Sequence, residues 1–160
     1  MVILPKKAYL TKGCGISRVS ELNAFDNALL AAKVGNSSLV KCTSILPPDV
    51  EILEEMREVV NGEILPSIYA KSCKYNDSDS EIEVIAGLGV AITDEMGLVA
   101  EIESEEDEVL GDVERRLEGL LREMASSRGL QIREMKLELS RCVVPPKSYG
   151  CALVVVALDV

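Results

Sequence analysis

The apolar segment at the end of the chain constrains its fold more than any other feature. All residues from Cys151 to Leu158 are apolar, and three consecutive valines stand among them. Valine favours strands, and a strand that is apolar on both faces needs a covering layer on each side. We therefore expect a central strand inside a layered fold.

Apolar or alternating runs bounded by turn residues predict the other strands. They are expected at Ala8–Thr11, Ser38–Ser44, Ile64–Lys74, Ile82–Thr93, Leu98–Glu103 and Gln131–Val144. The first should end at a Gly13–Cys14–Gly15 turn, and Asp94–Gly97 should join the fourth to the fifth. A short helical turn is expected at Glu54–Val60.

The first of two amphipathic helices is predicted over Glu21–Lys33. Ser20 is placed as its N-cap, and Gly35 follows its end. Apolar residues recur at helical spacing on one face, which should be buried. They are Leu22, Phe25, Leu29 and Ala32.

The second helix is predicted over Glu105–Ser127, and Gly129 should end it. Ser104 and Asp107 have the spacing of a capping box. Its expected buried stripe consists of Val113, Leu117, Leu120, Leu121 and Met124. Two principal helices and several consecutive strands indicate an α+β layered sandwich, and a length of 160 residues suits a single domain.

Composition excludes several functions. A net charge of −10 and 3% aromatic residues argue against a nucleic-acid partner, which needs basic clusters and stacking rings. The acidity suits a cationic small molecule, although an ordinary acidic surface explains it equally well. No apolar run reaches the roughly 18–20 residues of a membrane span, and the N-terminus lacks an export pattern, so we expect a cytoplasmic protein with no membrane partner.

The chain has no histidine, which excludes catalytic triads and sites that need an imidazole. Its five cysteines are scattered and form no CxxC pair. We therefore expect neither a disulfide framework nor a metal site, and we expect Cys42 and Cys151 to be inert buried thiols.

Four motifs carry a resemblance to a known family. They are Leu22–Asp26 (LNAFD), Gly35–Asn36, Lys41–Pro48 (KCTSILPP) and Gly97–Glu103 (GLVAEIE). In this order, and through to the terminal Gly150–Leu153 strand, the chain resembles the pyruvoyl-dependent arginine decarboxylases. The resemblance implies an αββα sandwich with mainly antiparallel sheets, and a homotrimer with active sites between protomers.

The resemblance also implies self-cleavage between Thr43 and Ser44. The Ser44 hydroxyl attacks the Thr43 carbonyl, and elimination of the resulting ester leaves a dehydroalanine that loses ammonia to water. Residues 1–43 become the β chain, and 44–160 become the α chain with a covalent pyruvoyl group at its start. This group forms a Schiff base with L-arginine and takes up electrons as carbon dioxide leaves, without pyridoxal phosphate or a metal. The product would be agmatine, which feeds polyamine synthesis.

Residue roles follow from the same resemblance. Asp26 matches the aspartate that pairs with the substrate guanidinium, which can donate two parallel hydrogen bonds to a carboxylate. Glu101 matches the acid that protonates the carbanion, and Gly35 matches a glycine on the pocket rim. Ser38 stands where the family usually has an Asn implicated in processing and substrate contact, and Thr43 stands where Ser is common.

Other interpretations stay open. Without the resemblance, Asp26 is interpreted as a solvated helix carboxylate, Glu101 as one acid among many, and Ser44 as a loop serine. The Ser38 departure admits a self-cleaving decarboxylase of another amino acid. An unprocessed, non-catalytic paralogue is a further alternative. A hydrolase with Ser44 as its N-terminal nucleophile is the last, and it would keep a free amine.

Overall fold

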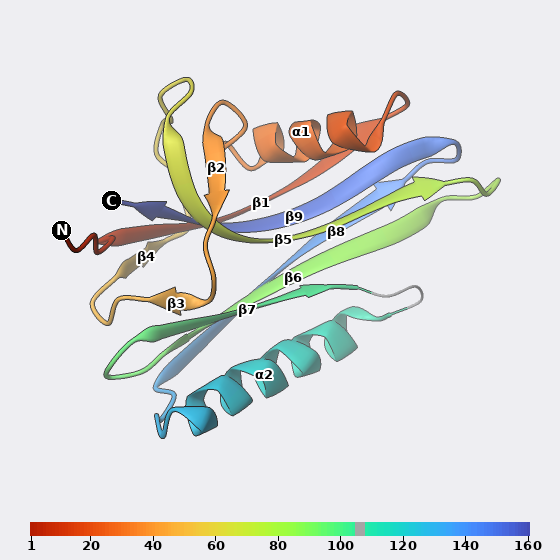
Figure 1. Ribbon diagram of the computed structural model, residues 1–160. Coiled ribbons are helices and arrows are strands. Elements are labelled where there is room, and N and C mark those ends of the chain that lie inside the picture. Colours follow the sequence, from red (N-terminus) through yellow and green to blue (C-terminus); the bar gives the residue numbers. More distant parts are fainter. Residues whose placement is uncertain (105–107) are drawn as a thin grey trace.

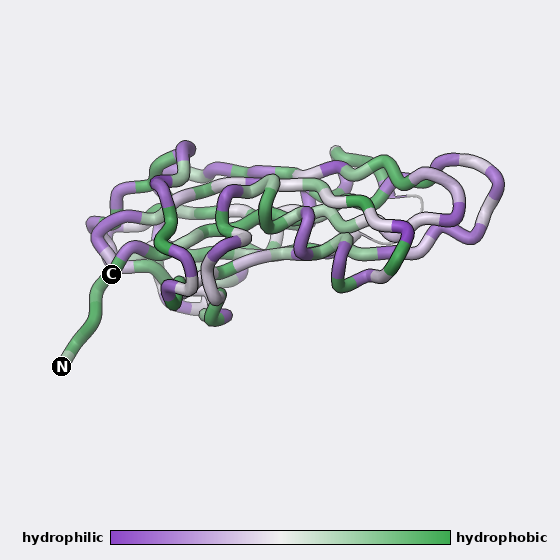
Figure 2. The backbone as a smooth tube through the Cα atoms, turned by 90° about the horizontal axis from the view of Figure 1, so that it is seen from above, coloured by the Kyte–Doolittle hydropathy of each residue, from purple (hydrophilic) through white to green (hydrophobic). Residues whose placement is uncertain are grey.

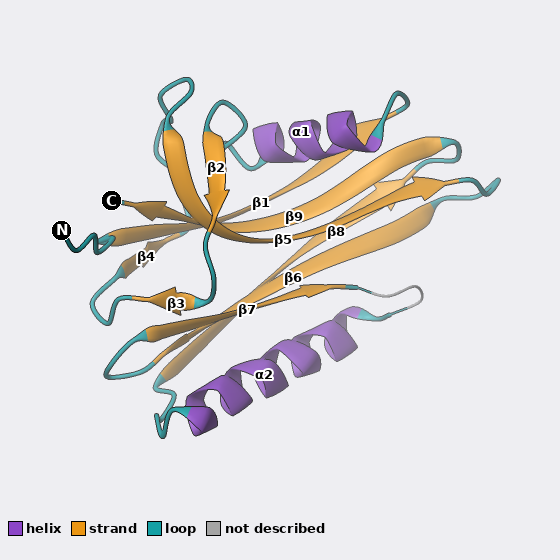
Figure 3. Cartoon of the chain, in the orientation of Figure 1, coloured by secondary structure: helices purple, strands orange, loops and turns teal. Residues whose placement is uncertain are grey.

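The computed structural model describes residues 1–104 and 108–160, and it has four layers: helix, sheet, sheet and helix (Figure 1). The elements of this described part are β1 (Lys7–Ser17), α1 (Glu21–Ala31), β2 (Ser38–Lys41), β3 (Ile45–Leu46), β4 (Glu51–Leu53), β5 (Ile64–Asn76), β6 (Ile82–Ile92), β7 (Gly97–Glu103), α2 (Leu110–Ser127), β8 (Glu134–Val144) and β9 (Ser148–Asp159). Helix α1 covers the outer face of one sheet and α2 the outer face of the other (Figure 3).

Within the described residues, the strands form a five-stranded sheet, β2-β5-β9-β1-β4, and a four-stranded sheet, β3-β7-β6-β8. The β1–β4 and β2–β5 pairs are parallel, and the other pairs are antiparallel. The predicted α+β sandwich with mainly antiparallel sheets and two principal helices is therefore confirmed.

Strand β9 is the central, doubly covered strand that its apolar sequence predicts. It lies between β5 and β1 in the five-stranded sheet. Its alternate residues Ala152, Val154 and Val156 pack into the core between the sheets, whereas Leu153 and Val155 pack beneath α1. A third apolar cluster lies between α2 and the four-stranded sheet.

Strand β1 is longer than predicted, because Gly13–Cys14–Gly15 continues the strand and is not a turn. A Cβ atom on Gly15 would lie 2.1 Å from the Ala24 carbonyl oxygen, and one on Gly13 would lie 2.1 Å from that of Ala28. The two glycines therefore let the backbone of α1 rest directly on β1. These glycines are needed for the packing of the helix on the strand, and not for the turn that the sequence predicted.

The helix predictions are confirmed in part. Ser20 caps α1, since its Oγ accepts from the Asn23 N–H at 3.0 Å. Leu22 and Leu120 were expected on buried faces, but they are 75% and 43% exposed. The Glu54–Val60 segment is not helical.

The start of the second helix also differs from its prediction. Helix α2 begins at Leu110, and its N-cap Val109 makes no side-chain capping bond. Ser104 instead accepts from the Ile85 N–H through its Oγ at 3.0 Å. Asp107, the other half of the predicted capping box, lies outside the described residues.

The expectation that the cysteines form no disulfides is wrong. Cys14 bonds to Cys142, and Cys73 bonds to Cys151, so Cys151 is buried but is not a free thiol. Cys73 and Cys151 are direct cross-strand neighbours on β5 and β9, and the other pair joins β1 to β8. Sequence separations of 128 and 78 hide this proximity, because antiparallel pairing and sheet stacking create it.

The two termini lie on the same side of the molecule, since Lys7 near the N-terminus pairs with Asp159 near the C-terminus. The four apolar residues Met1–Leu4 extend away from the body, and each is more than half exposed (Figure 2). Neither α1 nor α2, the helices of the described part, is long and apolar enough to cross a membrane.

Candidate active site

The Thr43–Ser44 peptide bond lies where the chain crosses from one sheet to the other (Figure 1). Strand β2 is an edge of the five-stranded sheet, and β3 is an edge of the four-stranded sheet. On one side of the bond, the Cys42 N–H donates to the Ser67 carbonyl oxygen at 2.8 Å. On the other side, the Ser44 carbonyl oxygen accepts from the Val99 N–H at 2.8 Å. Each side of the bond is thus anchored to a different sheet.

Proline explains why β3 is short. Pro47 and Pro48 follow β3 at once, and a proline cannot donate to a sheet ladder. Leu46 is buried in the core between the sheets and fixes β3 against β7. Thr43 itself is exposed, and Ser44 is half-buried. The bond is accessible, and its flanking residues are held in place.

Glu101 lies on β7 close to this crossover. Val99, which binds the Ser44 carbonyl, is two residues away and faces the core between the sheets, so Glu101 shares that face. One Glu101 oxygen, Oε1, lies 3.4 Å from the Lys41 ammonium nitrogen. The other, Oε2, is buried without a hydrogen-bond partner among the described residues. A cavity of about 220 Å³ adjoins this carboxylate, lined by Lys41, Ala70, Glu101, Ile102 and Glu103.

Cation–π and ring contacts extend from the Glu101 carboxylate, through Lys41, to helix α1. The Lys41 ammonium lies 4.8 Å from the centroid of the Tyr69 ring, and that ring lies 6.3 Å from the Phe25 ring. The Lys71 ammonium lies 4.5 Å from the Phe25 centroid. Such cation–π contacts hold a charge while leaving much of it solvated. Lys41 and Tyr69 were not predicted as site residues, although Lys41 stands within the KCTSILPP motif.

Asp26 lies on the exposed side of α1, next to Phe25 in the chain. Its carboxylate makes no hydrogen bond or ion pair with any residue that the structure describes. Within this described part of one chain, no such bond joins Asp26 to Ser44 or Glu101. An unpaired carboxylate on an exposed helix face is available to an external cation.

Gly35 and Ser38 lie towards the start of β2, away from the crossover at its end. A Cβ atom on Gly35 would lie 2.7 Å from Leu30 Cδ2, so the close turn after α1 requires glycine. Gly35 lines a cavity of about 420 Å³ between the end of α1 and residues 56–61. Ser38 has an exposed side chain, and its N–H donates to the Glu63 carbonyl oxygen at 2.7 Å. One chain therefore brings Ser44 and Glu101 together but places Gly35 and Ser38 elsewhere.

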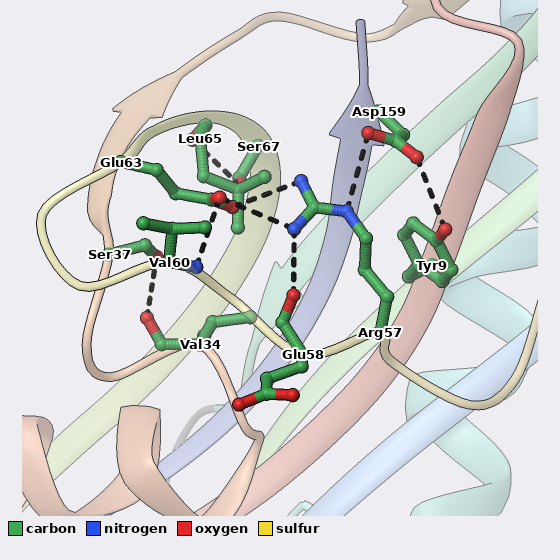
Figure 4. Close-up of polar contacts among 10 residues, drawn as sticks. All are labelled: Tyr9, Val34, Ser37, Arg57, Glu58, Val60, Glu63, Leu65, Ser67 and Asp159. Atoms are coloured by element: carbon green, nitrogen blue, oxygen red, sulfur yellow. Dashed lines mark hydrogen bonds and ion pairs between the residues drawn. The ribbon is translucent and has the colours of Figure 1, made fainter.

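A charged network supports the segment that forms the wall of this second cavity (Figure 4). Arg57 binds both Glu63 oxygens, at 3.0 and 3.3 Å, and its Nε donates to Asp159 at 3.3 Å. Tyr9 donates its hydroxyl to Asp159 at 3.2 Å, and the Val60 N–H donates to Glu63 at 3.1 Å. The hydrogen bond from Arg57 lowers the pKa of Glu63, helped by the backbone bond from Val60, and the hydrogen bond to Glu63 raises the pKa of Arg57.

Comparisons with known proteins agree with the motifs. The family model of pyruvoyl-dependent arginine decarboxylase matches residues 7–159. The protein of that name from Methanothermobacter thermautotrophicus is 35% identical over 159 residues, covering 99% of this chain and 100% of the relative. Those from Thermococcus kodakarensis and Pyrococcus horikoshii are 30% and 31% identical, and the alignments cover 94% or more of both chains.

Proposed function

The chain belongs to the pyruvoyl-dependent arginine decarboxylase family, and we propose that it converts L-arginine to agmatine and carbon dioxide with a pyruvoyl group made from its own Ser44. The observation that carries the proposal is the position of Thr43–Ser44, which lies in a crossover held at both ends by backbone hydrogen bonds. Cleavage there breaks no sheet pairing, because neither residue belongs to a strand.

The cleavage uses the atoms of this segment and one water molecule. The Ser44 Oγ attacks the Thr43 carbonyl carbon and forms an ester as the peptide nitrogen leaves. Loss of the Ser44 α-proton expels the Thr43 carboxylate, and water then replaces the amine and releases ammonia. The products are residues 1–43 with an ordinary carboxylate and residues 44–160 with a ketone in place of the amine.

The residues around Ser44 fit such a group. The Ser44 carbonyl oxygen remains the acceptor of the Val99 N–H after cleavage, so the new terminus stays fixed on β7. The ketone supplies an electrophile for the substrate amine and takes up electrons as carbon dioxide leaves. Glu101, on the same strand as Val99, is the proposed donor of the proton that replaces the lost carboxylate.

The proposed substrate contacts need a second protomer. Asp26 is exposed and unpaired among the described residues, which suits recognition of a guanidinium group, but it has no contact with Ser44 in its own chain. We therefore propose that a homotrimer supplies Asp26, or Gly35 and Ser38, to the Ser44 and Glu101 of a neighbour. Size measurement of the cleaved protein by light scattering tests this assembly directly.

Denaturing intact-mass measurement, with and without borohydride, tests the self-cleavage. With the disulfides reduced, we expect two fragments divided after Thr43, the larger lacking an amine and gaining mass with borohydride. Ser44→Ala should remain a single chain, whereas Ser37→Ala should cleave normally because Ser37 lies outside the crossover and its hydroxyl donates to the Val34 carbonyl. A wild-type chain that stays at 17.3 kDa after its disulfides are reduced would support the non-catalytic alternative.

The substrate is tested separately. Asp26→Asn keeps the shape of the side chain and removes the charge that pairs with guanidinium. We expect it to raise the KM for arginine strongly while the pyruvoyl content per chain stays unchanged. Decarboxylation of another amino acid with equal efficiency in both proteins would favour the alternative substrate that the Ser38 departure admits.

A further inference from the structure

Lys41 and Glu101 form an ion pair beside the proposed cleavage site. Lys41 is the last residue of β2 and precedes Ser44 by three residues. Its ammonium lies between the Tyr69 ring, at 4.8 Å, and Glu101 Oε1, at 3.4 Å. The ring and the carboxylate thus confine one end of an otherwise flexible side chain.

The Glu101 carboxylate depends on this contact. Its second oxygen is buried without a hydrogen-bond partner in the described part of the chain, so Lys41 is the partner that holds the group. Among its neighbours around the cavity, Glu103 carries a like charge and Ala70 and Ile102 carry none. Without the lysine, nothing on these neighbours attracts the carboxylate, and repulsion from Glu103 favours other rotamers.

We propose that Lys41 is a positioning residue for Glu101, an inference that rests on the proposed function. The ammonium group fixes Oε1 and thereby fixes the orientation in which the carboxyl group delivers its proton. Proton transfer requires hydrogen-bond reach, so a rotated carboxyl group lowers the rate of that step and leaves substrate binding unchanged.

The chain offers a matched control for this pair. Lys12 and Glu138 form a surface ion pair at 2.8 Å, with side chains 54% and 30% exposed. The corresponding fractions for Lys41 and Glu101 are 52% and 34%. Both lysines therefore lose a similar surface contact when they are replaced by methionine, but only one lies beside the proposed site.

Kinetics of purified, cleaved protein test the proposal, with rates normalised to ketone content. We expect Lys41→Met to lower kcat about 10–100-fold with little change in KM. Lys41→Arg, which keeps the positive charge, should retain most of the wild-type kcat. Lys12→Met should have the kcat and KM of the wild type. In a Glu101→Gln background, Lys41→Met should have no further effect. A kcat within twofold of the wild type in Lys41→Met would overturn the positioning role, and so would full activity of Glu101→Gln. Absence of ketone in the wild type would instead refute the proposed function.

The Cys14–Cys142 disulfide carries a second, independent inference. Cys14 lies on β1 within residues 1–43, and Cys142 lies on β8 within residues 44–160. The Cys73–Cys151 bond lies wholly within residues 44–160, and Cys42, the other cysteine of the smaller product, is a free thiol. The bond between Cys14 and Cys142 thus spans the proposed cleavage site.

We infer that this disulfide keeps the two self-cleavage products covalently joined, which also rests on the proposed function. Its formation takes two electrons and two protons from the thiols, with a low-molecular-weight disulfide as the oxidant. Cys14 is exposed, so such an oxidant can reach it in the folded protein. The bond also crosses between the sheets, since β1 and β8 belong to different ones.

Denaturing mass measurement after alkylation of free thiols tests the link. Without reductant we expect one joined species, and with reductant two fragments. Cys14→Ser should give two fragments in both conditions, and Cys73→Ser should behave like the wild type. Separate fragments without reductant, alkylated at Cys14 and Cys142, would refute the link, whereas a single uncut chain under reduction would refute the cleavage itself.

Discussion

Gly15 provides the sharpest test of how α1 is seated on the sheet. A methyl group at this position would meet the Ala24 carbonyl oxygen at 2.1 Å and the Ala28 nitrogen at 2.3 Å. Ordinary contacts begin near 3.4 Å, and both atoms are helix backbone, so no side-chain rotation relieves the clash. The whole helix must therefore move outward by roughly 1 Å and loosen the packing of buried Ala24 and Ala28. We expect Gly15→Ala to destabilise the protein by about 3 kcal/mol, or about 6–12 °C in Tm for a chain of this size.

The control is the same methyl group placed where space is open. Gly119 lies inside α2, is exposed, and has no atom within 4 Å of the position that a Cβ would occupy. Gly119→Ala should stabilise the protein by up to about 1 kcal/mol through helix propensity. Urea unfolding followed by circular dichroism measures both variants. A Gly15→Ala protein within about 0.5 kcal/mol of the wild type, at an unchanged m-value, would refute direct backbone packing of α1 on β1.

Three further predictions concern other parts of the fold. The hydrogen bond from Arg57 holds the pKa of Glu63 below its ordinary value of 4.5. The stability that this carboxylate contributes is therefore complete above pH 4.5 and is lost as the pH falls through the lowered pKa. In Glu63→Gln, acid unfolding should begin at a similar or higher pH, and the free energy of unfolding should depend less steeply on pH. Leu117→Ala empties a fully buried position under α2 and should cost about 3 kcal/mol in urea unfolding. Asn76→Ala removes a buried donor from the Val144 carbonyl, bonded at 2.9 Å, and should cost about 2 kcal/mol, measured in the same way.

The fold class was predictable because its evidence is local. The apolar run of β9 predicts a doubly covered strand, and the spacing of apolar residues in α2 predicts a helix. The length of β1 was not predictable, because the role of Gly13 and Gly15 depends on α1, a separate element that packs on them. In the same way, the partner of Cys14 is set by the stacking of two sheets, which no window of sequence contains.

The candidate site shows the same division. Motif resemblance indicated Ser44 and Glu101 as candidate site residues, and the pairing of β3 with β7 places both near the crossover. It did not indicate Lys41, since a lysine on an exposed strand is ordinary until its distance from Glu101 is known. The resemblance implied active sites between protomers, but motif order along the sequence did not indicate that Asp26 is a residue without a contact to Ser44 in the described part of its own chain.

The crossover explains why the proposed self-cleavage would leave the fold intact. Residues 1–43 contribute β1, α1 and β2, and β1 pairs on one side with β9 and on the other with β4, both from residues 44–160. Strand β2 pairs in turn with β5. Cleavage after Thr43 would therefore turn contacts within one chain into contacts between two, with the strand pairs unchanged. Cleavage would instead change the unfolded state, because two separate chains have more conformational and translational entropy than one. The Cys14–Cys142 bond joins the two chains, lowers that entropy and so would restore part of the stability lost on cleavage.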